Sequence, residues 1–451
     1  MKTFRLICTL ACLILGPYVV AQEGYSSASL SMNRANGVTT PDQVVVEEYL
    51  NYHRHQIPLP RGVEEVALSI DYQPLDNKQV IIQVGIATKK LIDYSNIPPI
   101  NVALVIDRSG SMQSDAKLEK VKRALSKFIQ GLRPNDYISI ITYESAAQTV
   151  LSAKQVRTIA NLDQMIQSIY AGGSTNLHGG LMLGYQEVQK NFDPAYTNKV
   201  ILLTDGIANV GETNPEKIVK QSGFYNRGGI DVSTIGVGRD LNFSLLQQIS
   251  KQGRGDNHFV GNSEEDITKV FENELESLLS PIGKEVQLAL EYPEEMELKS
   301  VLGYSPTFQG RQIQFPLNNI NNGLTQVFIL IGEWKGKQKP LNFQAQLNYF
   351  SCAKQAKATV TTSEKLKLAQ SFRNEEVLKN YQIAQMATAL KTMALHASTG
   401  KANEAVATID ASLMELKATF PHLRDNDLIR VRDILLANQG KLNQFMMSKN
   451  R

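Results

Sequence analysis

The sequence predicts an α/β protein with a doubly wound parallel sheet, followed by a β-sandwich domain and a C-terminal helical segment. Short apolar runs rich in β-branched residues, at residues 102–106, 138–141 and 200–203, are typical of parallel strands buried on both faces. Across residues 97–280 such runs alternate with helical patterns, which is the order of a doubly wound sheet. From residue 281 apolar residues recur at every second position, which indicates strands with one buried face.

The first 21 residues have the organisation of a cleavable export signal. Lys2 and Arg5 form a short basic start, residues 6–15 form an apolar core, and Ala21 precedes the expected cleavage point. The core is short for a membrane-spanning helix. We therefore expect an exported protein that is periplasmic, displayed on the cell surface or secreted. A lipoprotein anchored at Cys12 is the alternative, although the residues before Cys12 make a poor lipidation signal.

Residues 22–60 are predicted to form a flexible arm rich in Ser, Asn and Gly, with a short helix at residues 42–52. Within residues 61–96, alternating patterns at 66–72 and 80–87 predict two strands. Two strands cannot form a core of their own. We therefore expect them to join the later β-sandwich, with the α/β domain inserted between.

Helical patterns follow the strands of the α/β domain in turn. Asn214 and Pro215 have the residue types of a helix start, and Ser263 with Asp266 has the spacing of a capping box before the last helix. We expect helices at residues 117–132, 159–170, 177–189, from 215, from 243 and up to 279, with strands at 137–143, 200–203 and 231–237. This order supports the doubly wound arrangement.

Oxygen-bearing side chains follow two of the predicted strands. Asp107, Ser109 and Ser111 alternate along an extended loop, so their side chains point the same way. Asp205 follows a later strand, and Thr175 follows a pair of glycines. Ligands on parallel sheets collect at the carboxyl ends of the strands. We therefore expect these five side chains to meet in one crevice.

Two carboxylates and three hydroxyls are hard oxygen ligands. Completed by water to six-coordinate geometry, such a set is typical of Mg²⁺, with Mn²⁺ or Ca²⁺ as alternatives. Ser, Thr and Asp also cap helices and occupy loops. However, two converging carboxylates without a cation would repel each other and resist ionisation. The sequence therefore predicts a divalent-cation site.

The pattern Asp-x-Ser-x-Ser at residues 107–111, with Thr175 and Asp205, resembles the metal-ion-dependent adhesion site of von Willebrand factor A domains and integrin inserted domains. The resemblance implies a Rossmann-like fold over residues 97–280. It also implies direct metal contacts from the two serines and the threonine, and aspartates that often act through water. One coordination position is left open for a partner's carboxylate. Residues 46–60 resemble the region before this domain in exported bacterial members of the family.

Three classes of function follow from this resemblance and these motifs. The leading one is an exported, metal-dependent protein-binding or adhesion module whose cation coordinates an Asp or Glu of a partner protein. The second is a structural or assembly protein of the cell envelope, with the metal as a fold staple. The third, a Mg²⁺-dependent phosphohydrolase, is disfavoured because Ser109 and Gly206 stand where aspartate phosphatases carry acidic residues. The Gly-x-Ser-x-Gly elbow of serine hydrolases is also missing around Ser109, so no catalytic activity is expected.

Composition adds limits on partners and covalent links. A formal net charge of +3 gives no argument for nucleic acid or an anionic membrane as partner. No segment after the leader is apolar enough to cross a bilayer. Of three cysteines, only Cys352 lies outside the leader, so no internal disulfide is expected.

Residues 254–256 spell Arg-Gly-Asp, a cell-adhesion tripeptide that recurs by chance, and we expect a polar turn there.

The C-terminal third divides into two parts. Residues 281–363 carry the alternating patterns of the β-sandwich. Residues 364–451 are helical, with apolar stripes such as Ile409, Leu413 and Leu416 on one helix face. We expect these helices to pack on the sandwich or on one another; a partner-binding helical hairpin is the alternative.

Overall fold

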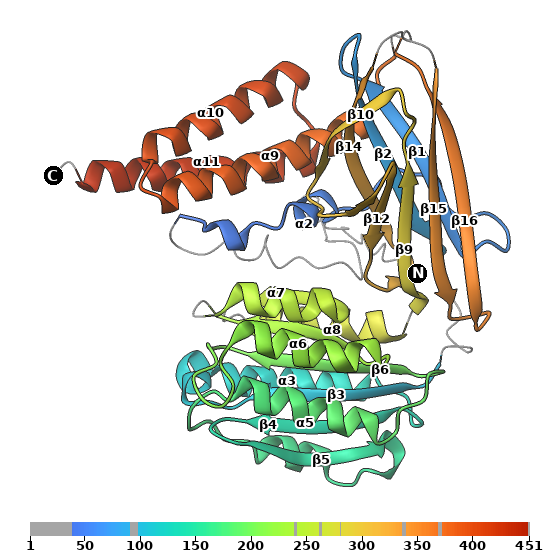
Figure 1. Cartoon of the computed structure of the whole chain (residues 1–451). Coiled ribbons are helices and arrows are strands. Elements are labelled where there is room, and N and C mark those ends of the chain that lie inside the picture. The colour runs from blue at the N-terminus through green and yellow to red at the C-terminus, as the bar shows by residue number, and fades with distance from the viewer. Residues whose placement is uncertain are drawn as a thin grey trace, which may run out of the picture.

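The computed structural model describes residues 38–90, 98–238, 241–260, 264–279, 281–335, 340–368 and 372–449. The predicted export signal, Cys12 and the first part of the arm lie outside these residues. In the described part of the chain, no helix is long and apolar enough to cross a membrane. The α/β domain forms one body, two further sheets lie beside it, and the C-terminal helices extend to one side of those sheets (Figure 1).

A six-stranded sheet in the order β5-β4-β3-β6-β7-β8 forms the centre of the α/β domain. Its strands are β3 (Ile100–Asp107), β4 (Tyr137–Tyr143), β5 (Ala147–Gln155), β6 (Thr197–Thr204), β7 (Asp231–Val237) and β8 (Arg254–Val260). Neighbours are parallel except for β4 and β5, which pair antiparallel. The sheet is therefore mixed rather than entirely parallel. Strands β3, β6 and β7 are buried at every position, as expected where helices cover both faces.

Helices cover both faces of this sheet. They are α3 (Lys117–Gln130), α4 (Leu162–Gln167), α5 (Leu177–Gln189), α6 (Pro215–Arg227), α7 (Phe243–Gln252) and α8 (Glu264–Leu279). Helices α3, α4 and α8 share a hydrophobic cluster with one face, and α5, α6 and α7 share another cluster with the opposite face. Helix α4 is shorter than the predicted helix at 159–170. It begins after Asn161, whose left-handed backbone (φ 60°) interrupts the helical conformation.

Two antiparallel sheets pack face to face beside the α/β domain. The smaller has the order β1-β2-β14-β10; the larger has the order β11-β12-β9-β15-β16, with β13 paired to β9. The strands are β1 (Val66–Pro74), β2 (Gln79–Thr88), β9 (Pro281–Glu291), β10 (Met296–Leu302), β11 (Thr307–Gln309), β12 (Gln312–Pro316), β13 (Ile320–Asn321), β14 (Thr325–Trp334), β15 (Leu341–Ser351) and β16 (Ala356–Leu366). One hydrophobic cluster joins the sheets, with Phe315 and Phe343 from one and Phe328 from the other. Because β2 pairs with β14, the α/β domain is inserted between strands of one sheet.

The C-terminal helices pack against the outer face of the smaller sheet. They are α9 (Glu375–Ser398), α10 (Ala402–Thr419) and α11 (Asn426–Lys449). A single hydrophobic cluster joins them to Ile81, Val327 and Ile329 of the sheet and to the N-terminal elements η1 (Pro41–Gln43) and α2 (Val46–Leu50). Helix α9 lies in the middle of this cluster, with the sheet on one side and α10 and α11 on the other (Figure 1).

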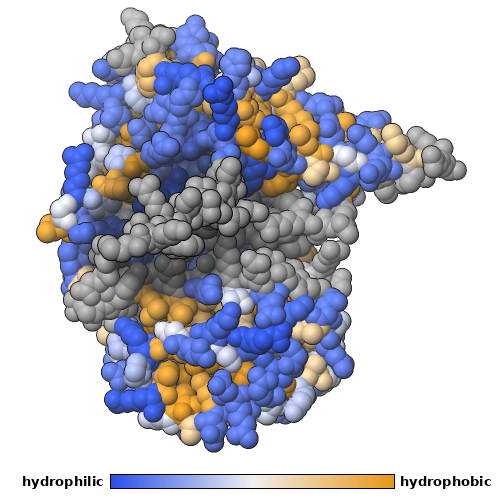
Figure 2. All heavy atoms as spheres, turned by 180° about the vertical axis from the view of Figure 1, so that it is seen from behind, coloured by the Kyte–Doolittle hydropathy of each residue, from blue (hydrophilic) through white to orange (hydrophobic). Residues whose placement is uncertain are grey.

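The face opposite to that of Figure 1 is largely hydrophilic. Hydrophobic side chains gather there over part of the α/β domain and beside the C-terminal helices (Figure 2). Cys352 is buried and has no disulfide partner among the described residues. Burial raises the pKa of its thiol to about 11, so the thiol is protonated at neutral pH.

Candidate metal centre

The predicted ligands come from three loops. Two follow β3 and β6, and the third joins α4 to α5. Asp107 is the last residue of β3, and Asp205 follows β6, which ends at Thr204. Because β3 and β6 are parallel neighbours, both carboxylates emerge at the same edge of the sheet. Ser109 precedes the 3₁₀ turn η2 (Gly110–Ala116), which contains Ser111.

Direct contacts link four of the five predicted residues. Ser111 Oγ donates a hydrogen bond to Asp205 Oδ1 at 2.7 Å, and Ser109 Oγ lies 3.0 Å from Ser111 Oγ. The backbone N–H of Ser109 donates to Asp107 Oδ1 at 2.8 Å. The hydroxyls and carboxylates therefore converge on one volume, as a shared cation requires.

Thr175 lies on the loop between α4 and α5 and reaches the same place. A Cβ atom on Gly206 would lie 3.5 Å from Thr175 Oγ1 and 3.8 Å from Ser111 Oγ, so both hydroxyls flank this glycine. Asn209 holds the Thr175 backbone at both polar atoms. Thr175 N donates to Asn209 Oδ1 at 2.8 Å, and Asn209 N donates to Thr175 O at 3.1 Å.

The glycines before Thr175 fasten the loop that carries it. Gly172 N donates to Arg108 O at 2.8 Å, and Gly110 N donates to Gly173 O at 3.1 Å. Gly173 has a φ of +76°, and a Cβ atom there would clash with the Glu144 carboxylate. Both the backbone conformation and the space therefore require glycine at this position. The site depends on this join between two loops that are distant in sequence.

The surroundings of Asp107 disfavour its charged form. Asp107 is fully buried and Asp205 is 2% exposed. Burial raises the pKa of Asp107 to about 6, even though hydrogen bonds from Ser109 and Thr204 lower it; the charge of Asp205 raises it further. The Thr204 hydroxyl donates to Asp107 Oδ2 at 2.8 Å. A divalent cation would relieve both the desolvation and the repulsion.

Lys117 is a residue of this site that the sequence reasoning missed. It is the first residue of α3, and its Nζ forms an ion pair with Asp205 Oδ2 at 2.7 Å. Lys117 is only 9% exposed. A cation at the start of a helix meets the positive end of the helix dipole. The sequence around Lys117 does not show which group offsets this conflict, because Asp205 lies 88 positions further along the chain.

The donor set fits a hard divalent cation. The five side chains offer only oxygen atoms, and those of Ser109, Ser111 and Asp205 contact one another directly. Lys117 is the one residue that does not fit a simple cation site, because its ammonium already contacts the Asp205 carboxylate that a metal ion would use. His178, on the first turn of α5, pairs instead with Gln221 of α6.

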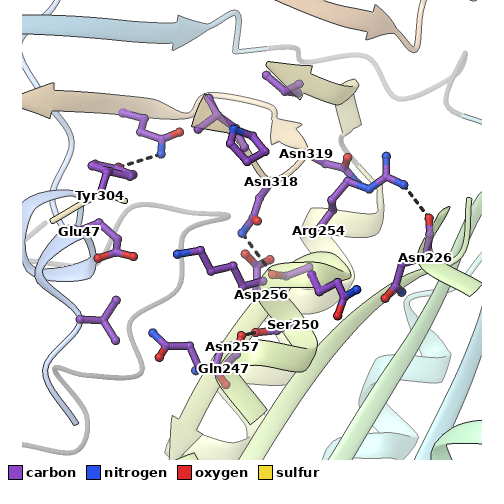
Figure 3. A pocket seen from close by; sticks show the side chains of 18 of the residues that line it. Glu47, Asn226, Gln247, Ser250, Arg254, Asp256, Asn257, Tyr304, Asn318 and Asn319 are labelled. Carbon is purple, nitrogen blue, oxygen red and sulfur yellow. Dashed lines mark hydrogen bonds between the residues drawn. The ribbon is translucent and has the colours of Figure 1, made fainter. Parts of the chain in front are cut away.

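The Arg-Gly-Asp tripeptide is not the exposed polar turn that the sequence predicted. Residues 254–256 begin strand β8, and Asp256 is buried. Asp256 N donates to Ser233 Oγ at 2.9 Å. Arg254 and Asp256 line a cavity of about 530 Å³ between the α/β domain and the two sheets (Figure 3). The tripeptide therefore contributes to an interdomain contact and is not presented for adhesion.

Comparison with known sequences identifies the class of the α/β domain. Residues 101–273 match the von Willebrand factor type A domain. The Uncharacterized protein YfbK of Escherichia coli (strain K12) is 29% identical over 262 residues, which are 56% of this chain and 45% of that protein. The inter-alpha-trypsin inhibitor heavy chain H3 of Rattus norvegicus is 29% identical over 220 residues, which are 47% of this chain and 24% of that protein. The chain thus spans less than half the length of these relatives.

Solved structures resemble more of the chain. A von Willebrand factor type A structure from Catenulispora acidiphila has a TM-score of 0.58 at 14% identity, over 82% of this chain and 96% of that one. The ArnB paralog VWA2 from Sulfolobus acidocaldarius has a TM-score of 0.50 at 18% identity, over 85% of this chain and 98% of that one. At such identities the likeness shows the fold alone. The chain contains a von Willebrand factor type A domain, accompanied by a sheet-rich domain and C-terminal helices.

Proposed function

We propose that this protein is an exported, metal-dependent protein-binding module. A divalent cation, Mg²⁺ before Mn²⁺ or Ca²⁺, is held by Asp107, Ser109, Ser111, Thr175 and Asp205, and it coordinates an Asp or Glu side chain of a partner protein. The observation that carries the proposal is the convergence of two buried carboxylates and the serine hydroxyls at one edge of the sheet. The bound cation supplies a Lewis-acid position for the partner's carboxylate.

The surface beside the site offers apolar contact area. Ile207, two residues after Asp205, is 54% exposed, and Tyr170, before the Gly172 loop, is 72% exposed. The side chain of Arg108 donates to Tyr170 O at 3.3 Å. A single carboxylate–metal contact orients a partner, whereas buried apolar and aromatic side chains supply most of the affinity of an interface. We infer a partner surface in which an acidic residue is flanked by apolar ones.

The test is capture of protein partners from an extract by the immobilised full chain. Capture is run in Mg²⁺ and in EDTA, with the wild type, Asp205→Asn and the control Asp410→Asn, whose carboxylate lies exposed on α10. We expect the same partners with the wild type and the control in Mg²⁺, and their loss in EDTA or with Asp205→Asn. Capture that persists under all conditions contradicts the proposal.

The same variants test the structural alternative. If the metal is only a fold staple, Asp205→Asn lowers the midpoint of thermal unfolding in Mg²⁺ but leaves partner capture unchanged. If the metal recognises the partner, capture is lost at temperatures where the variant remains folded. Circular dichroism beside the capture experiment separates these results.

A further inference from the structure

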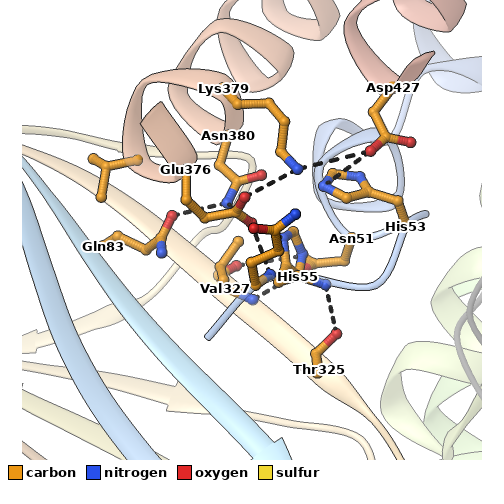
Figure 4. A network of polar contacts seen from close by, with 12 residues as sticks. Asn51, His53, His55, Gln83, Thr325, Val327, Glu376, Lys379, Asn380 and Asp427 are labelled. Carbon is orange, nitrogen blue, oxygen red and sulfur yellow. Dashed lines mark hydrogen bonds and ion pairs between the residues drawn. The ribbon is translucent and has the colours of Figure 1, made fainter. Parts of the chain in front are cut away.

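Two buried histidines lie where the N-terminal segment meets the C-terminal helices. His53 and His55 follow α2, and each is 3% exposed. Their rings lie 4.5 Å apart, centroid to centroid. Glu376 of α9 and Asp427 of α11 approach them from the other side (Figure 4). Residues more than 300 positions apart in the sequence thus form one cluster.

The imidazole nitrogens in this cluster lack ordinary partners. Among the described residues, His53 Nδ1, His53 Nε2 and His55 Nδ1 make no hydrogen bond. His55 Nε2 is the exception, because it lies 3.0 Å from Asn51 Oδ1. Buried polar groups are normally hydrogen-bonded, so nitrogens left without partners point to a ligand.

The spacing of the cluster matches that of metal ligands. His53 Nε2 lies 3.7 Å from Asp427 Oδ2, and His55 Nδ1 lies 3.7 Å from Glu376 Oε1. These gaps are too long for hydrogen bonds. Two ligands of a tetrahedral zinc ion lie roughly 3.3–3.5 Å apart, given metal–ligand bonds of about 2.0–2.2 Å. One ligand atom from each of His53, His55 and Glu376 lies within 4.8 Å of the others, so a small closure brings all three onto one ion.

The protonation state of the cluster also suits a metal. Burial lowers the pKa of His53 well below its usual value and lowers that of His55. The neutral imidazole is the form with the lone pair that a metal needs. Gln56 N and Asn380 Nδ2 donate to Glu376 Oε1 at 3.0 Å and 3.2 Å. These two donors fill the lone pairs of Oε1, so a metal bound by this oxygen displaces one of them.

Two cations, Lys379 and Arg430, oppose a metal here, and Arg430 Nη2 lies 3.8 Å from Asp427 Oδ1. Lys379 is the nearer of the two to Glu376. Its Nζ lies 3.0 Å from Glu376 Oε2 and 3.8 Å from Asp427 Oδ2. The ammonium contacts the carboxylate oxygen that does not face His55, so it shares Glu376 with a metal rather than blocking it. Its charge nevertheless lowers the affinity of the site for any cation.

A second cluster of similar composition lacks these features. Asp256, His258 and Glu274 lie within the same 4.8 Å limit. However, His258 Nε2 lies 2.9 Å from Glu274 Oε1, and Lys199 Nζ lies 2.9 Å from Glu274 Oε2. Although burial works against it, the hydrogen bond and charge of Glu274 raise the pKa of His258. This cluster is a closed ion-pair network whose imidazole already has its partner.

We propose that His53, His55 and Glu376 bind a borderline divalent transition metal of the Zn²⁺ class, with water completing its coordination. Imidazole nitrogen distinguishes this site from the all-oxygen site of the von Willebrand factor type A domain. The ion fastens the segment after α2 to α9. The inference is independent of the proposed partner-binding function, because it uses none of the same residues.

The test is a calorimetric titration of ZnCl₂ into the full chain in excess Mg²⁺, which occupies the oxygen site. Wild type, His53→Gln, His55→Gln and the control His422→Gln, an exposed loop histidine, are compared. We expect one Zn²⁺ per chain in the wild type and control, and at least about tenfold weaker binding in the two cluster variants, since even loss of an outer-shell partner costs 10–100-fold. Equal affinity in all four proteins, or no binding to the wild type, overturns the proposal.

Lys379→Met keeps the proposal testable if the histidine variants do not fold. Removing the ammonium beside Glu376 is expected to strengthen Zn²⁺ binding, because the repulsion between cations is lost. Circular dichroism confirms that the variant is folded, so that a gain in affinity is not caused by side chains exposed on unfolding. Co²⁺ in place of Zn²⁺ adds a second readout, since four-coordinate Co²⁺ with nitrogen ligands absorbs strongly in the visible range. Unchanged or weaker Zn²⁺ binding by Lys379→Met counts against the site.

Discussion

Lys117 puts a fixed positive charge inside the candidate metal centre. Asp205 accepts a hydrogen bond from Ser111 at Oδ1 and an ion pair from Lys117 at Oδ2. The ammonium therefore partly neutralises a carboxylate that the cation needs. At the scale of single residues, affinity for metal is set by this competition as well as by the five oxygen ligands.

We expect Lys117→Met to bind Mg²⁺ more tightly than the wild type. Unit charges 4 Å apart interact by about 1 kcal/mol in water and by more when partly buried, so a gain of about tenfold is expected. Calorimetric titration measures it, with Lys127→Met, an exposed lysine on the same helix, as control. Weaker binding in Lys117→Met would show that the ammonium supports the site.

Gly173 and Gly172 form a matched pair for testing the loop that carries Thr175. Gly173 has a positive φ and Glu144 beside it, whereas a Cβ atom on Gly172 would meet no other atom within 4 Å. We expect Gly173→Ala to lower the free energy of unfolding by about 1–2 kcal/mol, the cost of a left-handed non-glycine residue. Gly172→Ala should change it little. Urea denaturation of both variants checks this, and equal stability contradicts the account of the loop.

At the scale of elements, the join between the segment after α2 and helices α9 and α11 is rich in buried polar groups. His53 and His55 face Glu376, Lys379, Asp427 and Arg430 there. Arg430 lies over the Tyr52 ring at 4.2 Å. The apolar cluster holds these elements together. The stability of their contact also depends on the charge state of the buried polar groups.

The stability of the chelator-treated chain should fall as the pH drops below the ordinary histidine pKa of 6.5. Because burial lowers the folded-state pKa of His53 and His55, the unfolded state binds more protons in this range, and the free energy of unfolding decreases toward acid. His258 and Asp107, both with raised pKa values, contribute in the opposite direction.

Urea denaturation in EDTA between pH 8 and pH 5 isolates the contribution of the two histidines. His53→Gln should flatten the decline in unfolding free energy, whereas His422→Gln should leave it unchanged. An identical pH profile for the wild type and His53→Gln would show that the buried imidazole does not titrate with unfolding.

At the scale of the whole molecule, local patterns were predictable and long-range partners were not. Strands β3 and β6 and the ligands after them follow from apolar runs and polar residues adjacent in sequence. Strand β5 was missed because its exposed, irregularly buried residues resemble a loop. Lys117 was missed because its partner Asp205 lies far along the chain.

The same limit explains the other surprises of the fold. Arg254 and Asp256 looked like a surface turn, but the sheets that follow the α/β domain cover this stretch. The histidine cluster takes its carboxylates from α9 and α11, far from His53 and His55 in sequence. Contacts of this kind depend on how the domains pack, and the hydrophobic pattern within one segment does not predict that packing.

The most direct test of the central claim is a calorimetric titration of Mg²⁺ and Mn²⁺ into the full chain, beside Asp205→Asn and Asp410→Asn. We predict one binding site in the wild type and in Asp410→Asn, and its loss in Asp205→Asn, because that variant removes one of the two buried carboxylates. Undiminished binding in Asp205→Asn, or no binding of either ion to the wild type, would contradict the assignment of this site.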